Sequence, residues 1–265
     1  MFIDRFIYRK GKLPMIEVYE NLLNRGSPRI AAIAFGDKFA EGTIEEIART
    51  SCVVVEPVLH SNASRRIDEM MIDTLKADLL YVVIDADEMN IDNLDTIDRI
   101  ITKCGAMAIG ICIGDISCRY LFKFETITKA FYFEATDRIQ KYVALITTMI
   151  NRALQPDSLV GIDLSDLRMC LTGTKNRVWF GKSYGKEKGG DIAYQFKKSD
   201  WYKNESCYSC KAMLVIIAGD ISLYDANEAF SAISYMLKND VLLLVSVCFD
   251  KDAYEEMSMI VIDSK

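Results

Sequence analysis

Residues 161–167 read Gly161-Ile162-Asp163-Leu164-Ser165-Asp166-Leu167, and they lie between a long helical segment and a second, shorter predicted helix. The two carboxylates, Asp163 and Asp166, are three residues apart, which places both on one face of the first helical turn. An acid that opens a helix, with another acid three residues later, is typical of helix capping, because side-chain oxygens there accept hydrogen bonds from free N–H groups. The pattern by itself therefore predicts a capped helix.

The part of the chain before this loop alternates between short apolar runs and amphipathic stretches. Short apolar runs fit buried strands, and the stretches between them repeat with helical spacing. The sequence predicts strands at 29–35, 52–59, 78–84, 106–113 and 126–133, and helices at 42–48, 65–76 and 91–104. Apolar strands separated by helices predict a mostly parallel, Rossmann-like sheet that is covered on both faces.

A long amphipathic segment follows, with apolar residues at helical spacing from Thr136 to Leu154 and a proline at Pro156. Because proline cannot continue a helix, the segment is predicted to end there. Later elements are predicted as a short helix after Asp163, strands at 177–185 and 212–218, helices at 190–198 and 225–237, and an antiparallel pair of strands at 241–249 and 257–261. We therefore expect an α/β protein with a Rossmann-like domain at 1–135, a central helix at 136–158 and a smaller mixed α/β domain at 159–265.

Composition excludes several classes of protein. With 265 residues, of which 51% are hydrophobic, the chain can bury a substantial core. A net charge of −6 argues against binding to nucleic acid or to an anionic membrane surface. Charges interrupt the first ten residues, and no later apolar run could span a bilayer, so the sequence predicts a cytoplasmic protein without direct membrane binding. Eight cysteines without a secretory leader indicate a reducing compartment.

Three stretches of the second half carry a family resemblance: 161–168, 214–219 with the following 225–230, and 245–250. The first, Gly161-Ile162-Asp163-Leu164-Ser165-Asp166-Leu167-Arg168, is similar to the Asn-Val-Asp-Phe-Ala-Asp-Val-Arg loop of the tubulin/FtsZ family. The others resemble that family's strand, glycine turn and helix, and its strand that ends in a Leu-Asp turn. This family comprises the filament-forming GTPases of the cytoskeleton and of cell division. Order and spacing agree from about Thr136 to the end, and more weakly from Arg29 onward, so a tubulin/FtsZ-like fold is expected.

The resemblance also implies a role for the acidic loop. In that family, the loop of one subunit completes the nucleotide site of the next subunit and orients a water molecule for hydrolysis. Asp163 and Asp166 would accordingly be catalytic in trans, and the implied partner is another copy of this chain or an FtsZ/tubulin-like homologue. The chain stops at Lys265, directly after the last predicted strand. We therefore expect no terminal peptide of the kind through which the family's division protein reaches membrane adaptors.

The nucleotide-binding half departs from the family pattern. The family's Gly-Gly-Gly-Thr-Gly-Thr-Gly loop should follow the strand that ends at Ile84, where this chain reads Asp85-Ala86-Asp87-Glu88-Met89-Asn90-Ile91-Asp92. A phosphate cradle needs glycines, which let backbone N–H groups approach the ligand, and a helix N-terminus behind them. This stretch contains no glycine, and Asp92 enters the first turn of the next helix, where its charge complements the helix dipole.

Two further nucleotide elements are degenerate. The first glycine-rich turn, Gly36-Asp37-Lys38-Phe39-Ala40-Glu41-Gly42, keeps only its outer glycines. The family's guanine-contacting Asn-Asp-Arg is matched by Thr136-Asp137-Arg138, which lacks the asparagine. We therefore expect neither GTP nor another cofactor, with degenerate loops at Gly36, Asp37, Asp85, Asp87, Asp92 and Asp137.

These observations favour a protein that lacks conventional GTP binding and acts as a non-hydrolysing cytoskeletal filament or assembly component, or as a modulator of a related GTPase. Two alternatives stay open: a divergent polymerising GTPase with an altered pocket, and a stand-alone scaffold or ligand-binding protein that reuses the fold. Asp85, Asp87 and Glu88 could hold a hard cation, but a solvated acidic turn is favoured and no metal site is predicted. Cys207 and Cys210 form a CxxC pair without the further ligands that zinc needs.

Overall fold

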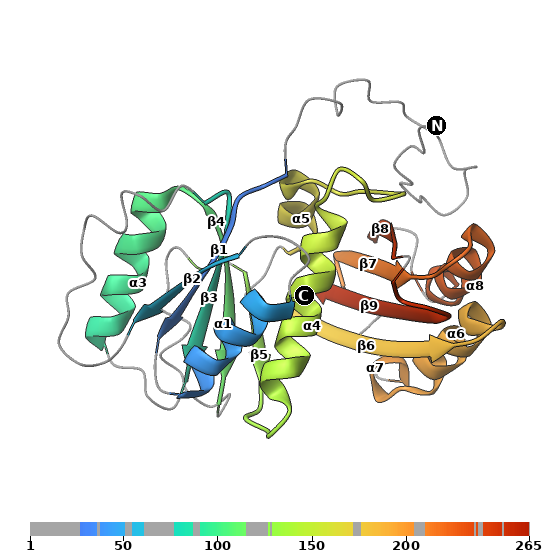
Figure 1. Ribbon diagram of the computed structural model, residues 1–265, viewed down its shortest axis with the longest axis horizontal. Helices are drawn as coiled ribbons and strands as arrows, with labels where there is room; N and C mark the ends of the chain where they lie inside the picture. Colours follow the sequence, from blue (N-terminus) through green and yellow to red (C-terminus); the bar gives the residue numbers. More distant parts are fainter. Residues whose placement is uncertain are drawn as a thin grey trace. The chain divides into compact units, whose positions relative to one another are not determined.

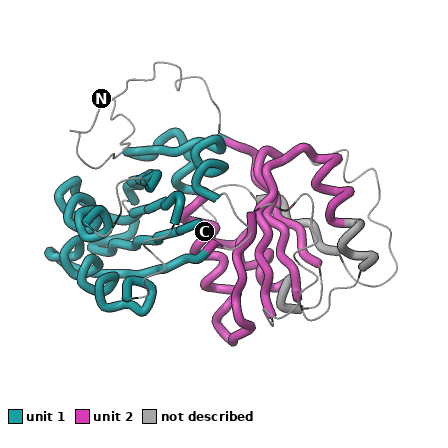
Figure 2. Tube along the Cα trace, turned by 180° about the vertical axis from the view of Figure 1, so that it is seen from behind, with its two compact units in different colours: residues 1–27, 152–172, 177–265 teal, residues 28–151, 173–176 magenta. Residues whose placement is uncertain are grey.

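The computed structural model describes residues 27–35, 38–50, 55–60, 77–86, 91–114, 127, 129–171, 176–203, 210–235, 237, 241–250 and 252–264, with only the backbone described at 38–41, 55–60 and 91–96. The described residues pack as two compact units (Figure 2). Unit 1 comprises Ser27 and those within 152–172 and 177–265, and unit 2 comprises those within 28–151 together with Asn176. Both units combine strands with helices, so the predicted α/β class is confirmed. The predicted domain boundaries at 135 and 158 stay a prediction.

Unit 2 contains a parallel sheet (Figure 1). Among the residues described, its strands are β1 (Ile30–Phe35), β2 (Val55–His60), β3 (Leu79–Asp85), β4 (Met107–Ile113) and β5 (Ala130–Phe133), in the order β2-β1-β3-β4-β5. Its helices are α1 (Lys38–Thr50), α3 (Ile91–Cys104) and most of α4 (Ile139–Ala153). Every residue of β1, β3 and β4 is buried, which explains why these strands are apolar throughout rather than alternating.

Several elements of unit 2 match the prediction from sequence. Helix α3 has the predicted bounds, and β1, β3 and β4 differ from theirs by at most one residue at each end. Strand β5 is shorter than predicted, and α4 begins later because Thr136 lies in the preceding turn, where its carbonyl accepts a hydrogen bond from the Ile139 N–H at 3.0 Å. The helix predicted at 65–76 lies outside the described residues.

Unit 1 contains a mixed sheet. Its described strands are β6 (Asn176–Tyr184, of which Arg177 onward belongs to unit 1), β7 (Ala212–Gly219), β8 (Leu242–Phe249) and β9 (Glu256–Ser264), in the order β6-β9-β7-β8. Its described helices are α5 (Leu164–Cys170), α6 (Lys188–Lys198), α7 (Asp200–Lys203) and α8 (Leu223–Ser234). Strand β7 is parallel to β8 and antiparallel to β9, and it is buried along its whole length.

The predicted antiparallel pairing of the last two strands is wrong, because β7 lies between them. The connection from β8 to β9 passes over the C-terminal end of β7. There the Asp250 N–H donates to the Gly219 carbonyl at 2.9 Å, and the Asp220 N–H donates to the Glu256 carbonyl at 2.9 Å. Gly219 has a φ of +139°, and a Cβ at this position would lie 2.2 Å from the Glu256 carbonyl oxygen. Glycine is therefore required at the end of β7, where the connection from β8 to β9 passes close to the backbone.

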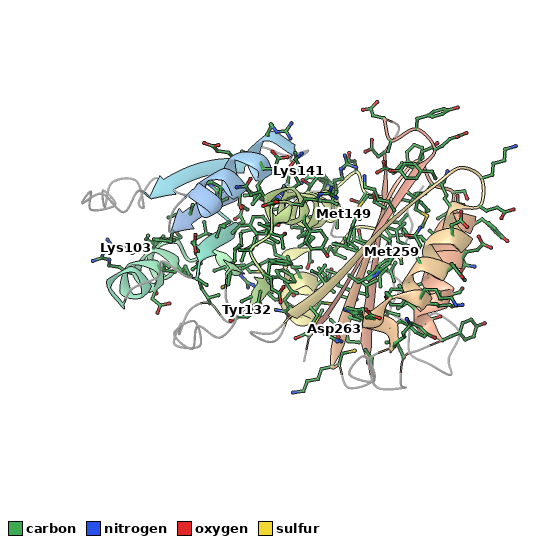
Figure 3. The ribbon with its side chains drawn as sticks, turned by 90° about the horizontal axis from the view of Figure 1, so that it is seen from below. Lys103, Tyr132, Lys141, Met149, Met259 and Asp263 are labelled. Carbon is green, nitrogen blue, oxygen red and sulfur yellow. The ribbon has the colours of Figure 1, made fainter. Side chains whose placement is uncertain are left out.

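A buried ion pair joins the start of β6 to the end of β9. The Arg177 guanidinium binds the carboxylate of the fully buried Asp263, with Nε donating to Oδ1 at 3.0 Å. Asp263 is labelled on its strand in Figure 3. The same guanidinium lies 5.0 Å from the centroid of the Trp201 ring, and that ring packs against Phe196. Removing Arg177 would leave the buried Asp263 charge without this partner and would also remove the contact with Trp201 of α7.

Candidate functional site

The acidic loop, residues 161–167, leads into α5 at Asp163. Asp163 is the N-cap residue, and its Oδ1 accepts hydrogen bonds from the N–H groups of Ser165 and Asp166 at 2.7 and 2.9 Å. In return, Oδ2 of Asp166 accepts a hydrogen bond from the Asp163 N–H at 2.9 Å. This reciprocal pattern is a capping box, which satisfies N–H groups that the helix leaves without intrahelical acceptors. The capping prediction is confirmed, and the catalytic role in trans stays a prediction.

Burial distinguishes the two carboxylates. Asp166 is only 2% exposed, whereas Asp163 is half-buried. Asp166 also affects a side chain one turn further along α5: burial, together with the Asp166 charge, raises the pKa of the Cys170 thiol to about 12. The Cys170 thiol is directed at the Met213 carbonyl, 3.7 Å away. Of the pair, Asp163 is therefore the more exposed carboxylate.

Backbone pairing holds the segment that precedes the loop. Val160 exchanges two backbone hydrogen bonds with Val247 on β8, at 3.1 and 2.9 Å, and its carbonyl also accepts from the Ser246 hydroxyl at 2.8 Å. The Ile162 N–H donates to the Ala153 carbonyl at 3.0 Å. Because these bonds lie within unit 1, that unit itself fixes where the acidic loop begins.

The second candidate position lies at the carboxyl ends of the strands in unit 2. The strand order β2-β1-β3-β4-β5 changes direction between β1 and β3, and doubly wound sheets bind ligands outside such a switch point. Asp85 is the last residue of β3 and is 7% exposed. The following Ala86 N–H donates to the Ile113 carbonyl at the end of β4, at 2.7 Å. Strand β3 therefore delivers a mostly buried carboxylate to the edge where this class of sheet binds ligands.

The other predicted nucleotide elements are described only in part. Gly36, Asp37 and Asp87 lie outside the described residues, and so does the side chain of Asp92 in the first turn of α3. Asp137 is exposed in the turn before α4. The predicted site residues thus fall at two separate places, the start of α5 in unit 1 and the strand ends of unit 2. That the loops around them are degenerate stays a prediction.

Sequence reasoning missed one packing feature beside these elements. Gly42 was expected both to close a degenerate glycine-rich turn and to open the helix predicted at 42–48, but α1 begins earlier, at Lys38, so Gly42 lies inside the helix. A Cβ at Gly42 would lie 2.6 Å from Nε2 of Gln140, on the first turn of α4. Glycine at this position therefore makes room for the Gln140 side chain. No local pattern could have revealed this, because the two residues are far apart in the sequence.

The described residues give no support for a metal site or a membrane span. Among the described residues, no group of three or more His, Cys, Asp or Glu side chains could hold a metal ion. Cys210 is buried next to the start of β7, and its predicted pair, Cys207, lies outside the described residues, as do Asp87 and Glu88 of the alternative cation site. No helix in the described part of the chain has the length and apolar character needed to cross a bilayer.

Comparison with known proteins bears on the fold. No protein-family model and no curated protein matches the sequence. The structure is similar to an empty FtsZ dimer from M. jannaschii (TM-score 0.73, 10% identity, 92% of this chain and 90% of that chain). It is also similar to two proteins from Haloferax volcanii: the GDP-bound CetZ1 monomer (0.64, 12%, 89% and 94%) and CetZ2 in a GTPγS-bound protofilament (0.57, 9%, 88% and 92%). The predicted resemblance is therefore confirmed at the level of structure, and this chain has the α/β fold of the FtsZ and CetZ structures.

Proposed function

We propose that this protein is a cytoskeletal filament or assembly component of the FtsZ-like type, and that its assembly does not depend on conventional GTP binding. Its partner in this proposal is another copy of the chain or an FtsZ-like homologue, whose turnover it would modulate. The fold supports the first part, since the similar structures include an FtsZ dimer and a CetZ2 protofilament. Fold by itself does not fix function, so the second part depends on the chemistry of particular residues.

The observation that carries the proposal is Asp85 at the end of β3. Its mostly buried carboxylate lies at the edge where a doubly wound sheet receives a ligand, and the chain from 85 to 92 contains no glycine. A triphosphate at this edge would meet a carboxylate and would lack the backbone N–H groups that a glycine-rich loop supplies.

The acidic loop takes a structural role in this proposal. Both of its carboxylates accept backbone hydrogen bonds at the start of α5, and Asp166 is almost fully buried. Asp163 is half-buried and is the more exposed of the two. We therefore assign the loop to contact with an FtsZ-like homologue and not to turnover.

Two measurements test the proposal together. Isothermal titration with GTP and with GDP, each with Mg²⁺, should give no binding, and sedimentation should give the same pelleted fraction with and without GTP. A conventional FtsZ serves as the positive control for both. A dissociation constant for GTP below about 10 µM, or about −7 kcal/mol of binding free energy, would overturn the proposal. So would assembly that occurs only when GTP is added.

The retained acidic pair favours a second candidate, a GTP hydrolase with an altered pocket whose loop acts on the neighbouring subunit. The two candidates differ in phosphate release. A hydrolase should release phosphate at a rate per protein that rises with protein concentration, because each site needs a second subunit, and Asp163→Ser should abolish the release. The assembly component should release none at any concentration.

A further inference from the structure

One end of the unit 1 sheet carries exposed aromatic side chains and exposed acids. It is formed by the chain after β6, the chain after β7 and the connection from β8 to β9; Figure 1 shows β6 ending beside the start of α6. Its exposed aromatics include Tyr184, Tyr224 and Tyr254, which are 60%, 70% and 81% exposed. We call this surface the acidic end, and its exposed members include Tyr184, Lys186, Glu187, Leu223, Tyr224, Phe249, Asp252, Tyr254 and Glu255.

Hydrogen bonds make these segments one surface. The Gly185 N–H donates to the Glu255 carbonyl at 3.0 Å, which joins the chain after β6 to the β8–β9 connection. The Glu255 N–H in turn donates to a carboxylate oxygen of Asp220, after β7, at 3.2 Å. Phe249 lies beside Gly219 in the register of β7 and β8. These hydrogen bonds therefore hold the segments that carry the exposed rings and acids in fixed positions relative to one another.

The acidic end has an excess of negative charge among the described residues. Glu187, Asp252 and Glu255 are exposed there, against one exposed cation, Lys186. Of the other lysines nearby, Lys182 is 2.5 Å from a Glu256 carboxylate oxygen, and Lys188 is buried. A partner for this surface should therefore carry exposed cations that can meet both the acids and the tyrosine rings.

The opposite end of the same unit has the complementary charge. Its exposed charged residues, among those described, are four lysines and one acid: Lys197 and Lys198 at the end of α6, Lys203 and Asp200 in α7, and Lys211 just before β7. Lys203 lies 3.7 Å from the Asp200 carboxylate, so Lys197, Lys198 and Lys211 supply the excess of positive charge. We call this surface the basic end.

Side-chain and backbone contacts place α7 at the start of β7. Trp201 of α7 lies under the Arg177 guanidinium, which binds Asp263, and Asp263 faces Met213 in the sheet. The Lys211 N–H donates to the carbonyl of the neighbouring Ser264 at 3.2 Å. Strand β7 has eight residues, so about 26 Å of strand separates the two ends. Among the described residues of unit 1, acids are therefore in excess at one end of the sheet and lysines at the other.

We propose that the acidic end of one copy of this chain binds the basic end of a second copy. Two different patches of the same molecule make a heterologous contact, which can repeat along a chain of subunits. Burial of the tyrosine rings against lysine side chains supplies affinity, and the charges steer and orient the encounter. The inference rests on the proposed function and names a surface pair for it, and the acidic loop at 161–167 takes no part in this contact.

Charge reversal tests the pairing. The first variant is Asp252→Lys with Glu255→Lys, and the second is Lys197→Glu with Lys198→Glu. Each alone should raise the critical concentration for assembly, measured by sedimentation, by roughly tenfold, because like charges then face each other. An equimolar mixture of the two variants should restore assembly, since each acidic surface again meets a basic one. Adding salt should weaken assembly of the unmodified protein, because it screens exposed charges.

Matched controls separate local pairing from total charge. Glu45→Lys with Glu134→Lys, and Arg99→Glu with Lys141→Glu, make the same charge changes at exposed positions of unit 2, and both should leave the critical concentration unchanged.

A second pair of variants tests the aromatic part of the contact. Tyr254→Ser should weaken assembly, while Tyr254→Phe, which keeps the ring, should not. Circular dichroism of every variant should first show that it is folded.

The outcomes separate the two levels of the proposal. If the unmodified protein assembles and the mixture of reversed variants fails to recover assembly, the pairing of these ends is refuted while the proposed function stands. If the controls weaken assembly as much as the test variants, the pairing is refuted in the same way. If the unmodified protein does not assemble at any concentration, with or without GTP, self-assembly fails together with this inference.

Discussion

Replacing Asp163 separates the structural use of the acidic loop from a chemical one. Asp163→Ala removes the oxygen that accepts hydrogen bonds from Ser165 and Asp166 at 2.7 and 2.9 Å. Loss of an N-cap side chain of this kind costs about 1 kcal/mol, within a range of roughly 0.5–2 kcal/mol. Serine is as good an N-cap as aspartate, so Asp163→Ser should stay within a few tenths of a kcal/mol of the unmodified protein.

The chain offers a local probe for this measurement. Its two tryptophans, Trp179 and Trp201, both belong to unit 1, as does α5. Urea unfolding followed by tryptophan fluorescence therefore reports the stability of the unit that contains the cap. A loss of about 1 kcal/mol lowers the unfolding midpoint by roughly 0.3–1 M when the urea dependence is about 1–3 kcal/mol per molar.

The comparison of the two variants decides the matter. If Asp163→Ala and Asp163→Ser both keep the stability of the unmodified protein, the capping argument is refuted. If both lose the same stability, the carboxylate charge stabilises the protein in some way other than through the cap. A third result would indicate that the Asp163 carboxylate is catalytic on a neighbouring subunit. In that case Asp163→Ser would keep its stability but lose any effect on the GTP turnover of an FtsZ-like homologue.

Three further predictions concern stability and reactivity. Gly219→Ala should destabilise unit 1 by roughly 2–4 kcal/mol in urea unfolding, because it combines an unfavourable φ with a clash against a carbonyl. Gly185→Ala, with φ +84° and open space around it, should cost only about 1 kcal/mol. Equal losses for the two variants would contradict the close approach of the Glu256 carbonyl to Gly219. Burial raises the pKa of Asp225, but hydrogen bonds from Ser222 and the nearby Lys188 outweigh it, so its pKa in the folded state lies below 3.8. Its stabilisation is then present above pH 3.8 and is lost as pH falls through the lower, folded value, and the stability difference from Asp225→Asn should shrink over that interval in acid titrations; a constant difference would count against it. Burial also raises the pKa of the Cys112 thiol to about 12. Peptide mapping after iodoacetamide treatment at pH 8 should therefore find this thiol unlabelled in the folded protein and labelled in urea. Labelling without urea would show the thiol to be accessible.

Much of the secondary structure could be predicted because it depends on local patterns. The apolar runs that became β1, β3 and β4 are buried on both faces, and the helical spacing from 91 to 104 matches α3. The capping box of α5 was also visible, because its two acids are three residues apart and bond to each other's backbone. In each case the residues that determine the structure are close neighbours in the sequence.

The candidate site could be predicted only in part. The sequence identified Asp85 as the residue that follows an apolar strand, but it could not show that its carboxylate is mostly buried. The position of Gly42 within α1, against Gln140, was not predicted either. Burial and contact of this kind depend on elements that are distant in the sequence, so a local pattern carries no information about them.

The sequence alone determined that this chain is an α/β protein with apolar, sheet-forming runs and a capped helix at Asp163, because periodicity and capping act over a few residues. Only the tertiary structure decided that β7 separates the last two strands, since strand pairing joins segments by backbone hydrogen bonds that any residue can make. It also decided that, among the described residues of unit 1, exposed acids are in excess at one end of the sheet and exposed lysines at the other. The sequence gives the number of charged residues, but their distribution over a surface depends on the direction in which each strand and helix runs.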